Sequence, residues 1–188
     1  MGDIVDYEML VNKEHPLNKT YIPNDLVDSG SNYKNGILVN KTVLENFNRM
    51  KDDARLFGYN IDIMSGYRDY LYQDDIYNKL ILEKGMAYAF RNIAPAGCSE
   101  HQTGLAIDIC VYKDDKCYIE HDIEDMDECK WLINNSYKYG FILRYPKGYE
   151  DKTGYNYEPW HYRYVGKIAP YLYKSSLLLE DYHRQKGF

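Results

Sequence analysis

The chain has 188 residues, of which 45% are hydrophobic and 28% are charged, a balance typical of a globular protein with its own core. Its formal net charge is −6 and no Lys/Arg cluster interleaves with aromatic residues, which argues against a nucleic-acid partner. The acidic residues 1–8 lack the features of a leader peptide, and no apolar stretch is long enough to span a bilayer. We therefore expect a soluble, cytoplasmic protein with no membrane partner.

The elements predicted in chain order alternate between helix and strand. An irregular segment rich in Asn, Asp, Gly and Pro, residues 1–36, comes first. Apolar periodicity then predicts helices over 40–57, 69–84, 127–139 and 167–186, and strands over 61–63, 105–112, 117–119, 141–145 and 160–165. Residues 92–103 and 146–155 are expected to be loops. The elements predict a single α+β domain over residues 1–188, with a small, mostly antiparallel sheet and helices packed on one side.

The segment SEHQTGLAID, residues 99–108, carries the first candidate ligands. Asp108 falls inside an apolar strand, where an ionised carboxylate is costly unless a cation or a partner stabilises it. Gly104 allows a tight turn before the strand, so that His101 and Asp108 can converge on one point. Either residue alone is better explained as an ordinary buried His or a loop-capping Asp, and only a second segment changes this interpretation.

That second segment is EPWH, residues 158–161, at the start of the last predicted strand. Residues three apart in a regular strand face opposite sides of the sheet. Glu158 and His161 can therefore share a site only if the backbone departs from strand geometry near Pro159, and we predict that it does.

The two segments together provide two imidazoles, one carboxylate ligand and one spare glutamate. This is the inventory of a catalytic zinc site at the sheet, with three protein ligands, an open position and a general base. The other histidines lie in polar or charged segments outside this pattern: His15, His121 and His183.

Two further motifs complete a family resemblance, SGYRDYLYQ at residues 65–73 and GFILRYP at residues 140–146. With the segments above, they occur in the same order as in the zinc D-alanyl-D-alanine carboxypeptidases of the VanY and VanXY type, a group related to VanX dipeptidases and L,D-carboxypeptidases. The chain resembles this family over roughly residues 35–167.

The resemblance implies a role for each of eight residues. The implied Zn²⁺ ligands are His101, Asp108 and His161. The implied substrate residues are Glu158 as catalytic base, Arg68 as oxyanion stabiliser, Gln73 and Ser99 as binders of the free C-terminal carboxylate, and Trp160 as a wall of the site. The fixed, permanently charged guanidinium fork of Arg68 suits an oxyanion. As ordinary alternatives, Arg68 could form a surface salt bridge, Gln73 could be solvated, and Ser99 could cap a turn.

The resemblance further implies release of the terminal D-Ala from peptidoglycan precursor pentapeptide, with D-Ala-D-Ala dipeptidase activity as an addition. In that family such activity removes the target of glycopeptide antibiotics such as vancomycin. An L,D-carboxypeptidase or muropeptide endopeptidase with the same zinc set, and a non-catalytic peptide-binding module, stay open as alternatives. The sequence alone predicts no oligomeric state.

Overall fold

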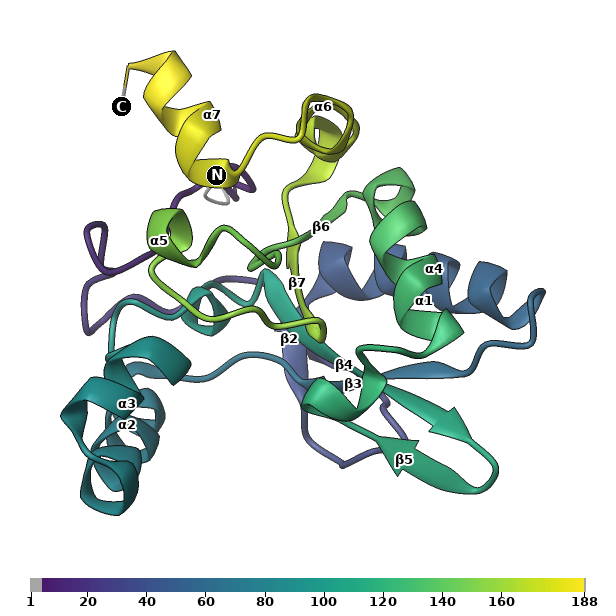
Figure 1. The fold of residues 1–188 in the computed structure, drawn as a ribbon, viewed down its shortest axis with the longest axis horizontal. Coiled ribbons are helices and arrows are strands. Elements are labelled where there is room, and N and C mark those ends of the chain that lie inside the picture. The colour runs from purple at the N-terminus through teal and green to yellow at the C-terminus, as the bar shows by residue number, and fades with distance from the viewer. Residues whose placement is uncertain (1–4, 188) are drawn as a thin grey trace.

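The computed structural model describes residues 5–187, and its largest element is a five-stranded sheet in which every pairing is antiparallel (Figure 1). Strands β3, β4, β7 and β6 lie side by side in that order, and β5 pairs with β4. A separate two-stranded ribbon joins β1 and β2. The strands are β1 Leu26–Asp28, β2 Leu38–Asn40, β3 Ile61–Ser65, β4 Ala106–Lys113, β5 Lys116–Tyr118, β6 Phe141–Leu143 and β7 His161–Tyr164.

Helices α1 and α4 both contact the 3-10 helix Ser136–Tyr139, and α2 and α3 pair with each other further from the sheet (Figure 1). The α-helices are α1 Lys41–Arg55, α2 Tyr70–Lys84, α3 Met86–Asn92, α4 Asp127–Asn135, α5 Glu150–Thr153, α6 Ala169–Ser175 and α7 Leu179–Lys186. The 3-10 helices are η1 Glu100–Thr103, η2 Glu120–Ile123, η3 Ser136–Tyr139 and η4 Gly166–Ile168. Within residues 5–187, no helix combines the length and apolarity needed to cross a bilayer.

The predicted α+β class with a small antiparallel sheet is confirmed. Helix α1 begins where Asn40 caps it, because the Asn40 side chain accepts hydrogen bonds from the backbone N–H groups of Thr42 and Val43. Its buried residues recur at helical spacing, as the sequence pattern predicts: Val43, Phe47, Met50 and Ala54. Asp69 caps α2 in the same way, and α2 ends before Gly85.

Alternation along β4 separates the core from the site. Ile107 and Ile109 belong to the main hydrophobic core together with Phe47 of α1. Because successive strand side chains point to opposite faces, Asp108 faces away from this core. Tyr162 of β7 belongs to the same core, which leaves its neighbour His161 on the face of Asp108.

Several short elements escape the sequence prediction. The ribbon strand β1 lies inside the segment expected to be irregular, whose first four residues fall outside the described range. Helix α3 and the single turn α5 lie where no helix is expected. The expected loop over residues 92–103 ends in η1, which Ser99 caps and Gly104 closes with a φ of +69°, a value that favours glycine.

Candidate metal centre and active site

Two strands and one short helix bring the predicted ligands together. Asp108 on β4 and His161 on β7 are directly opposed in the antiparallel register, so their side chains project from the same face. His101 lies in η1, just before β4, and the backbone N–H of Gly104 bonds to its carbonyl as the chain turns into the strand. All three side chains are buried.

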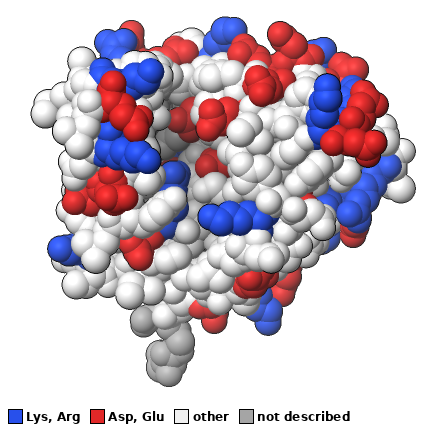
Figure 2. Space-filling view, turned by 90° about the horizontal axis from the view of Figure 1, so that it is seen from below, with Lys and Arg blue, Asp and Glu red and all other residues white. Residues whose placement is uncertain are grey.

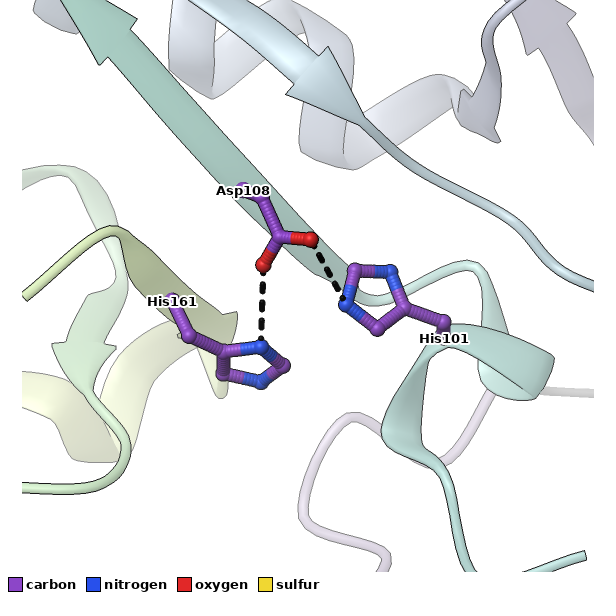
Figure 3. Close-up of side chains that lie close together, drawn as sticks. All are labelled: His101, Asp108 and His161. Carbon is purple, nitrogen blue, oxygen red and sulfur yellow. Dashed lines mark hydrogen bonds and ion pairs between the residues drawn. The ribbon is translucent and has the colours of Figure 1, made fainter. Parts of the chain in front are cut away.

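The three side chains converge around the carboxylate of Asp108 (Figure 3). Oδ2 of Asp108 lies 3.3 Å from Nε2 of His101, and Oδ1 lies 3.1 Å from Nδ1 of His161. One ligand atom from each residue falls within 4.8 Å of the others, a spacing that could hold one metal ion. Nε2 of His101 is buried with no hydrogen-bond partner within residues 5–187, as expected of an atom placed to bind a metal.

Hydrogen bonds fix which nitrogen of each ring faces the centre. Nδ1 of His101 donates to the carbonyl of Gly66 at 2.6 Å, which leaves Nε2 free to bind. His161 is turned the other way, because its Nε2 lies 3.3 Å from Oε2 of Glu100 while Nδ1 faces Asp108. The two rings therefore present different nitrogens to the centre, Nε2 of His101 and Nδ1 of His161.

The electrostatics of the centre favour a positive charge there. Burial and the nearby Arg68 lower the pKa of His101, which keeps that imidazole neutral and able to bind a metal. Burial disfavours the charged forms of Asp108 and His161, but the ion-pair and hydrogen-bond contacts of these two residues outweigh it. The two histidines hold the pKa of Asp108 well below its usual range, and Asp108 and Glu100 raise the pKa of His161 to about 9. A bound cation would take the place of that proton.

Glu158 lies beside the three ligands without joining them. Its Oε2 is 3.7 Å from Nδ1 of His161, and burial raises its pKa to about 7. The backbone N–H of His161 bonds to the Glu158 carbonyl, so a tight turn precedes β7, which starts at His161 itself. The predicted departure from strand geometry near Pro159 is confirmed, and it takes the form of this turn.

A cavity of about 180 Å³ opens over these residues, and Arg68, Ser99 and Trp160 are among those that line it. Figure 2 shows a hollowed face of the molecule with acidic and basic side chains inside the depression. Nε of Arg68 is buried without a hydrogen-bond partner within residues 5–187, so its N–H can donate a hydrogen bond to a ligand in the cavity.

Gln73 takes a different place from the other predicted substrate residues. It is buried on α2 and does not belong to the cavity lining. Its Nε2 donates to the carbonyl of Ala94 at 2.7 Å, and Ala94 does line the cavity. Gln73 therefore contacts the wall of the site from behind.

Three residues at the site have no place in the sequence prediction. Glu100 is fully buried next to His161, and Tyr145 lines the cavity with its ring against that of His161. His121, which the sequence places outside the zinc pattern, is exposed and packs edge-on against Trp160. Glu100 and Tyr145 stand inside the quoted motifs, which is the signal that could have found them.

Two imidazoles and a carboxylate around one point, with a separate buried glutamate at the edge of a cavity, form the arrangement that metal-dependent hydrolases use. Comparison with known proteins agrees, since residues 36–167 match the family described as VanY, D-alanyl-D-alanine carboxypeptidase. The chain belongs to the VanY family.

Individual relatives support the same assignment. The bifunctional D-Ala-D-Ala dipeptidase and D-Ala-D-Ala carboxypeptidase VanXYC of Enterococcus gallinarum is 36% identical over 179 residues, covering 93% of this chain and 92% of VanXYC. The solved structure of the LdcB LD-carboxypeptidase is 39% identical, covers 93% of this chain and 84% of its own, and superposes with a TM-score of 0.86. The VanY D,D-pentapeptidase of a VanB-type cassette, solved with Zn(II), is 33% identical over 94% of this chain and 98% of its own, with a TM-score of 0.80.

The chain is shorter than some of its relatives. It spans 65% of the Bacillus subtilis protein YodJ, to which it is 40% identical, and 56% of an Enterococcus faecium D-alanyl-D-alanine carboxypeptidase.

Proposed function

We propose that this chain is a zinc-dependent D,D-carboxypeptidase that removes the terminal D-Ala from peptidoglycan peptides and also accepts D-Ala-D-Ala. The observation that carries the proposal is the position of Glu158, buried 3.7 Å from a ligand of the three-residue centre yet outside it. The family match and the D-Ala-D-Ala activities named for VanXYC support the substrate class. This reaction is the one expected of a glycopeptide-resistance enzyme, since the VanY neighbour is described as a vancomycin resistance D,D-pentapeptidase.

The residues that would hold Zn²⁺ are His101 through Nε2, Asp108 through its carboxylate and His161 through Nδ1. Two nitrogen ligands and one oxygen ligand suit zinc and leave a position open for substrate or water. The zinc complex of the VanY neighbour supports this choice of metal. When bound, zinc supplies a Lewis acid that polarises the scissile carbonyl and acidifies water.

Glu158 would move the proton in this reaction. A base works best when its pKa lies near the working pH, and burial raises that of Glu158 to about 7. Its carboxylate takes the proton of the attacking water and then delivers it to the leaving amine of D-Ala. The guanidinium of Arg68 lies in the same cavity and would stabilise the negative charge that develops on the carbonyl oxygen during attack.

The polar wall of the cavity beside Arg68 would bind the free C-terminal carboxylate of the substrate. Ser99 lines this wall, with its hydroxyl accepting from the backbone N–H of His101 and its own proton available to a ligand. Gln73 would act by supporting Ala94 in that wall, and Trp160 would close the site on the other side. The limited cavity of about 180 Å³ favours a small terminal residue.

The decisive measurement is D-Ala release by the full chain from a pentapeptide ending in D-Ala-D-Ala and from the free dipeptide, with and without a chelator. We expect release from both substrates, loss on full chelation and recovery with added Zn²⁺. Activity that survives complete removal of the metal would refute the zinc mechanism, and an intact zinc-loaded protein inert on every peptide would favour a binding module.

A second candidate function is L,D-carboxypeptidase activity, because LdcB superposes with a TM-score of 0.86. The bond cleaved separates the two candidates. A tetrapeptide whose terminal D-Ala follows an L-configured residue is a substrate only for the L,D-activity, whereas a pentapeptide ending in D-Ala-D-Ala tests the D,D-activity. Preference for the tetrapeptide would replace our first proposal by the second.

A further inference from the structure

Glu100 lies at the centre of a buried network of charges behind the candidate metal site. Its side chain is fully buried, and Oε1 accepts from Nε of Arg144 at 2.7 Å and from a terminal nitrogen of Arg163 at 2.9 Å. Both guanidinium contacts fall on this one oxygen. The other oxygen, Oε2, faces Nε2 of His161 at 3.3 Å.

Because the two oxygens have different partners, the carboxylate of Glu100 is held in one orientation. The two arginines hold Oε1 in place, and Oε2 then has a fixed position from which to accept the Nε2 proton of His161. An imidazole that donates from Nε2 presents its lone pair at Nδ1, the atom that faces Asp108. Carboxylates that accept from the second nitrogen of a metal-binding histidine fix both its tautomer and its ring orientation.

A second carboxylate holds the network from outside. Arg144 donates to both oxygens of Glu180, at 2.9 Å for Oε2, and Glu180 lies in the second position of α7. Arg163 is held from another direction, because it donates to the backbone carbonyl of Met9 at 2.7 Å. Both Glu180 and Met9 lie outside residues 36–167, the part of the chain that matches the family.

We propose that Glu100 is a positioning residue for the metal ligand His161, and that Glu180 on α7 holds Glu100 in place through Arg144. The inference rests on the zinc ligand set proposed above. It makes the C-terminal helix part of the machinery that sets metal affinity, although that helix contributes no ligand. Loss of an outer partner of this kind costs about 10- to 100-fold in metal affinity or activity.

A purely structural role is the competing explanation, since a buried carboxylate between two guanidinium groups could serve stability alone. The two explanations differ for the Glu100→Gln variant. Whichever way the amide turns, its NH₂ group faces either a donor of His161 or the donors of the arginines. A positioning role then predicts weaker zinc binding by the folded variant, whereas a structural role predicts a lower melting temperature with unchanged affinity.

The test compares the full-length wild type with Glu100→Gln, Glu180→Gln and the matched control Asp181→Asn. Asp181 neighbours Glu180 on α7 but pairs with Lys152 at 3.5 Å, away from the network. Zinc affinity is measured by competition with a chelating dye, ligand geometry by the absorption spectrum of the Co²⁺-substituted protein, and stability by thermal unfolding of the metal-free protein.

We expect zinc affinity to fall by about 10- to 100-fold in Glu100→Gln and by a smaller factor in Glu180→Gln, with an altered Co²⁺ spectrum in both. Asp181→Asn should match the wild type in affinity and spectrum. Unchanged affinity and spectrum in a folded Glu100→Gln protein would overturn the positioning role, and the same result in Glu180→Gln would remove α7 from it.

If Glu100→Gln fails to fold, ¹⁵N NMR of the zinc-loaded wild type decides the question. The proposal requires His161 to carry its proton on Nε2 and His101 to carry it on Nδ1. The opposite tautomer at His161 overturns the proposal. A wild type that binds no zinc would instead refute the ligand set, so the two failures are distinguishable.

Discussion

Asp108 and His161 face each other directly across β4 and β7, with Oδ1 of the carboxylate 3.1 Å from Nδ1 of the imidazole. Two of the three candidate ligands therefore stand on adjacent, hydrogen-bonded strands of the five-stranded sheet, which position side chains more precisely than loops do. Glu158 stands instead on the turn that leads into β7. The chain thus separates the groups that would hold the metal from the group that would move the proton.

Replacing Glu158 by Gln should slow hydrolysis strongly and leave metal binding intact. The amide keeps the shape of the side chain but cannot accept a proton from water, and general bases contribute about 10²- to 10⁴-fold in rate. We expect kcat to fall by that factor while zinc content, measured by mass spectrometry, stays at one ion per chain. Glu83→Gln is the control, because Glu83 is exposed on α2, outside the cavity lining. A Glu158→Gln protein with wild-type kcat would show that another group is the base.

Replacing Arg68 by Lys should reduce kcat/KM by about 10²- to 10³-fold, the loss seen when one donor to a developing oxyanion is removed. Lys retains the charge but lacks the rigid fork, and it has a methylene carbon, which cannot donate a hydrogen bond, at the position of the buried Nε. Steady-state kinetics on a D-Ala-D-Ala-terminated peptide measure the effect, with zinc affinity as the internal check. Kinetics unchanged by this substitution would place the oxyanion donor elsewhere.

Replacing Gly66 by Ala should weaken both stability and zinc binding. An added Cβ would lie 2.3 Å from the carbonyl oxygen of Leu38 and 2.7 Å from Cγ1 of Val39, so the backbone must move. The carbonyl of Gly66 accepts the Nδ1 proton of His101, and its displacement would turn that ring. Gly148→Ala is the control for strain without contact, because Gly148 has a φ of +86° and open space around it. Equal zinc affinity in the two variants would argue against this coupling.

Stability should depend on the charge of Asp62 in a defined pH range. Burial alone would raise the pKa of Asp62, but the backbone N–H of Asn32 and the ammonium group of Lys51, 3.0 Å away, hold it below its ordinary value of 3.8. A lowered folded-state pKa means that the charge stabilises the fold above the unfolded-state pKa. This contribution disappears as pH falls through the folded-state value.

Asp62→Asn should accordingly reduce the free energy of unfolding at pH 7 by about 1.5–3 kcal/mol, the range for hydrogen bonds to charged groups. Urea unfolding of both proteins in the presence of chelator measures the difference, which should shrink as the pH is taken below about 3.8. A difference that stays constant through this range would show that the Asp62 charge is not its source.

The sequence predicts the candidate ligands because their chemistry conflicts with their surroundings. Asp108 stands between Ile107 and Ile109 in an apolar strand, and such a charge requires a partner. Helix α1 is equally predictable, since its buried residues follow a clear helical period. The short elements are not, because three residues in β1 or four in α5 are too few to show a period.

The buried charge network around Glu100 could not be predicted from the sequence, for a different reason. Glu100 is separated from Arg144 and Arg163 by 44 and 63 residues, and charged residues in a sequence are ordinarily assigned to the surface. Only the tertiary structure brings them together. The family resemblance names Gln73 as a carboxylate binder, but only the tertiary structure shows that it is buried on α2 and donates to the carbonyl of Ala94 instead of lining the cavity.

The opposed register of Asp108 and His161 has a consequence for how this chain reaches its fold. A slip of β7 by one residue along β4 would turn His161 toward the apolar face and bring Tyr162 to the metal side. This slipped pairing would leave the site without His161, so a metal ion present during refolding would stabilise the correct alignment over it. With the proposed ligand set, metal binding would favour the correct pairing of β4 with β7 in addition to supplying the chemistry.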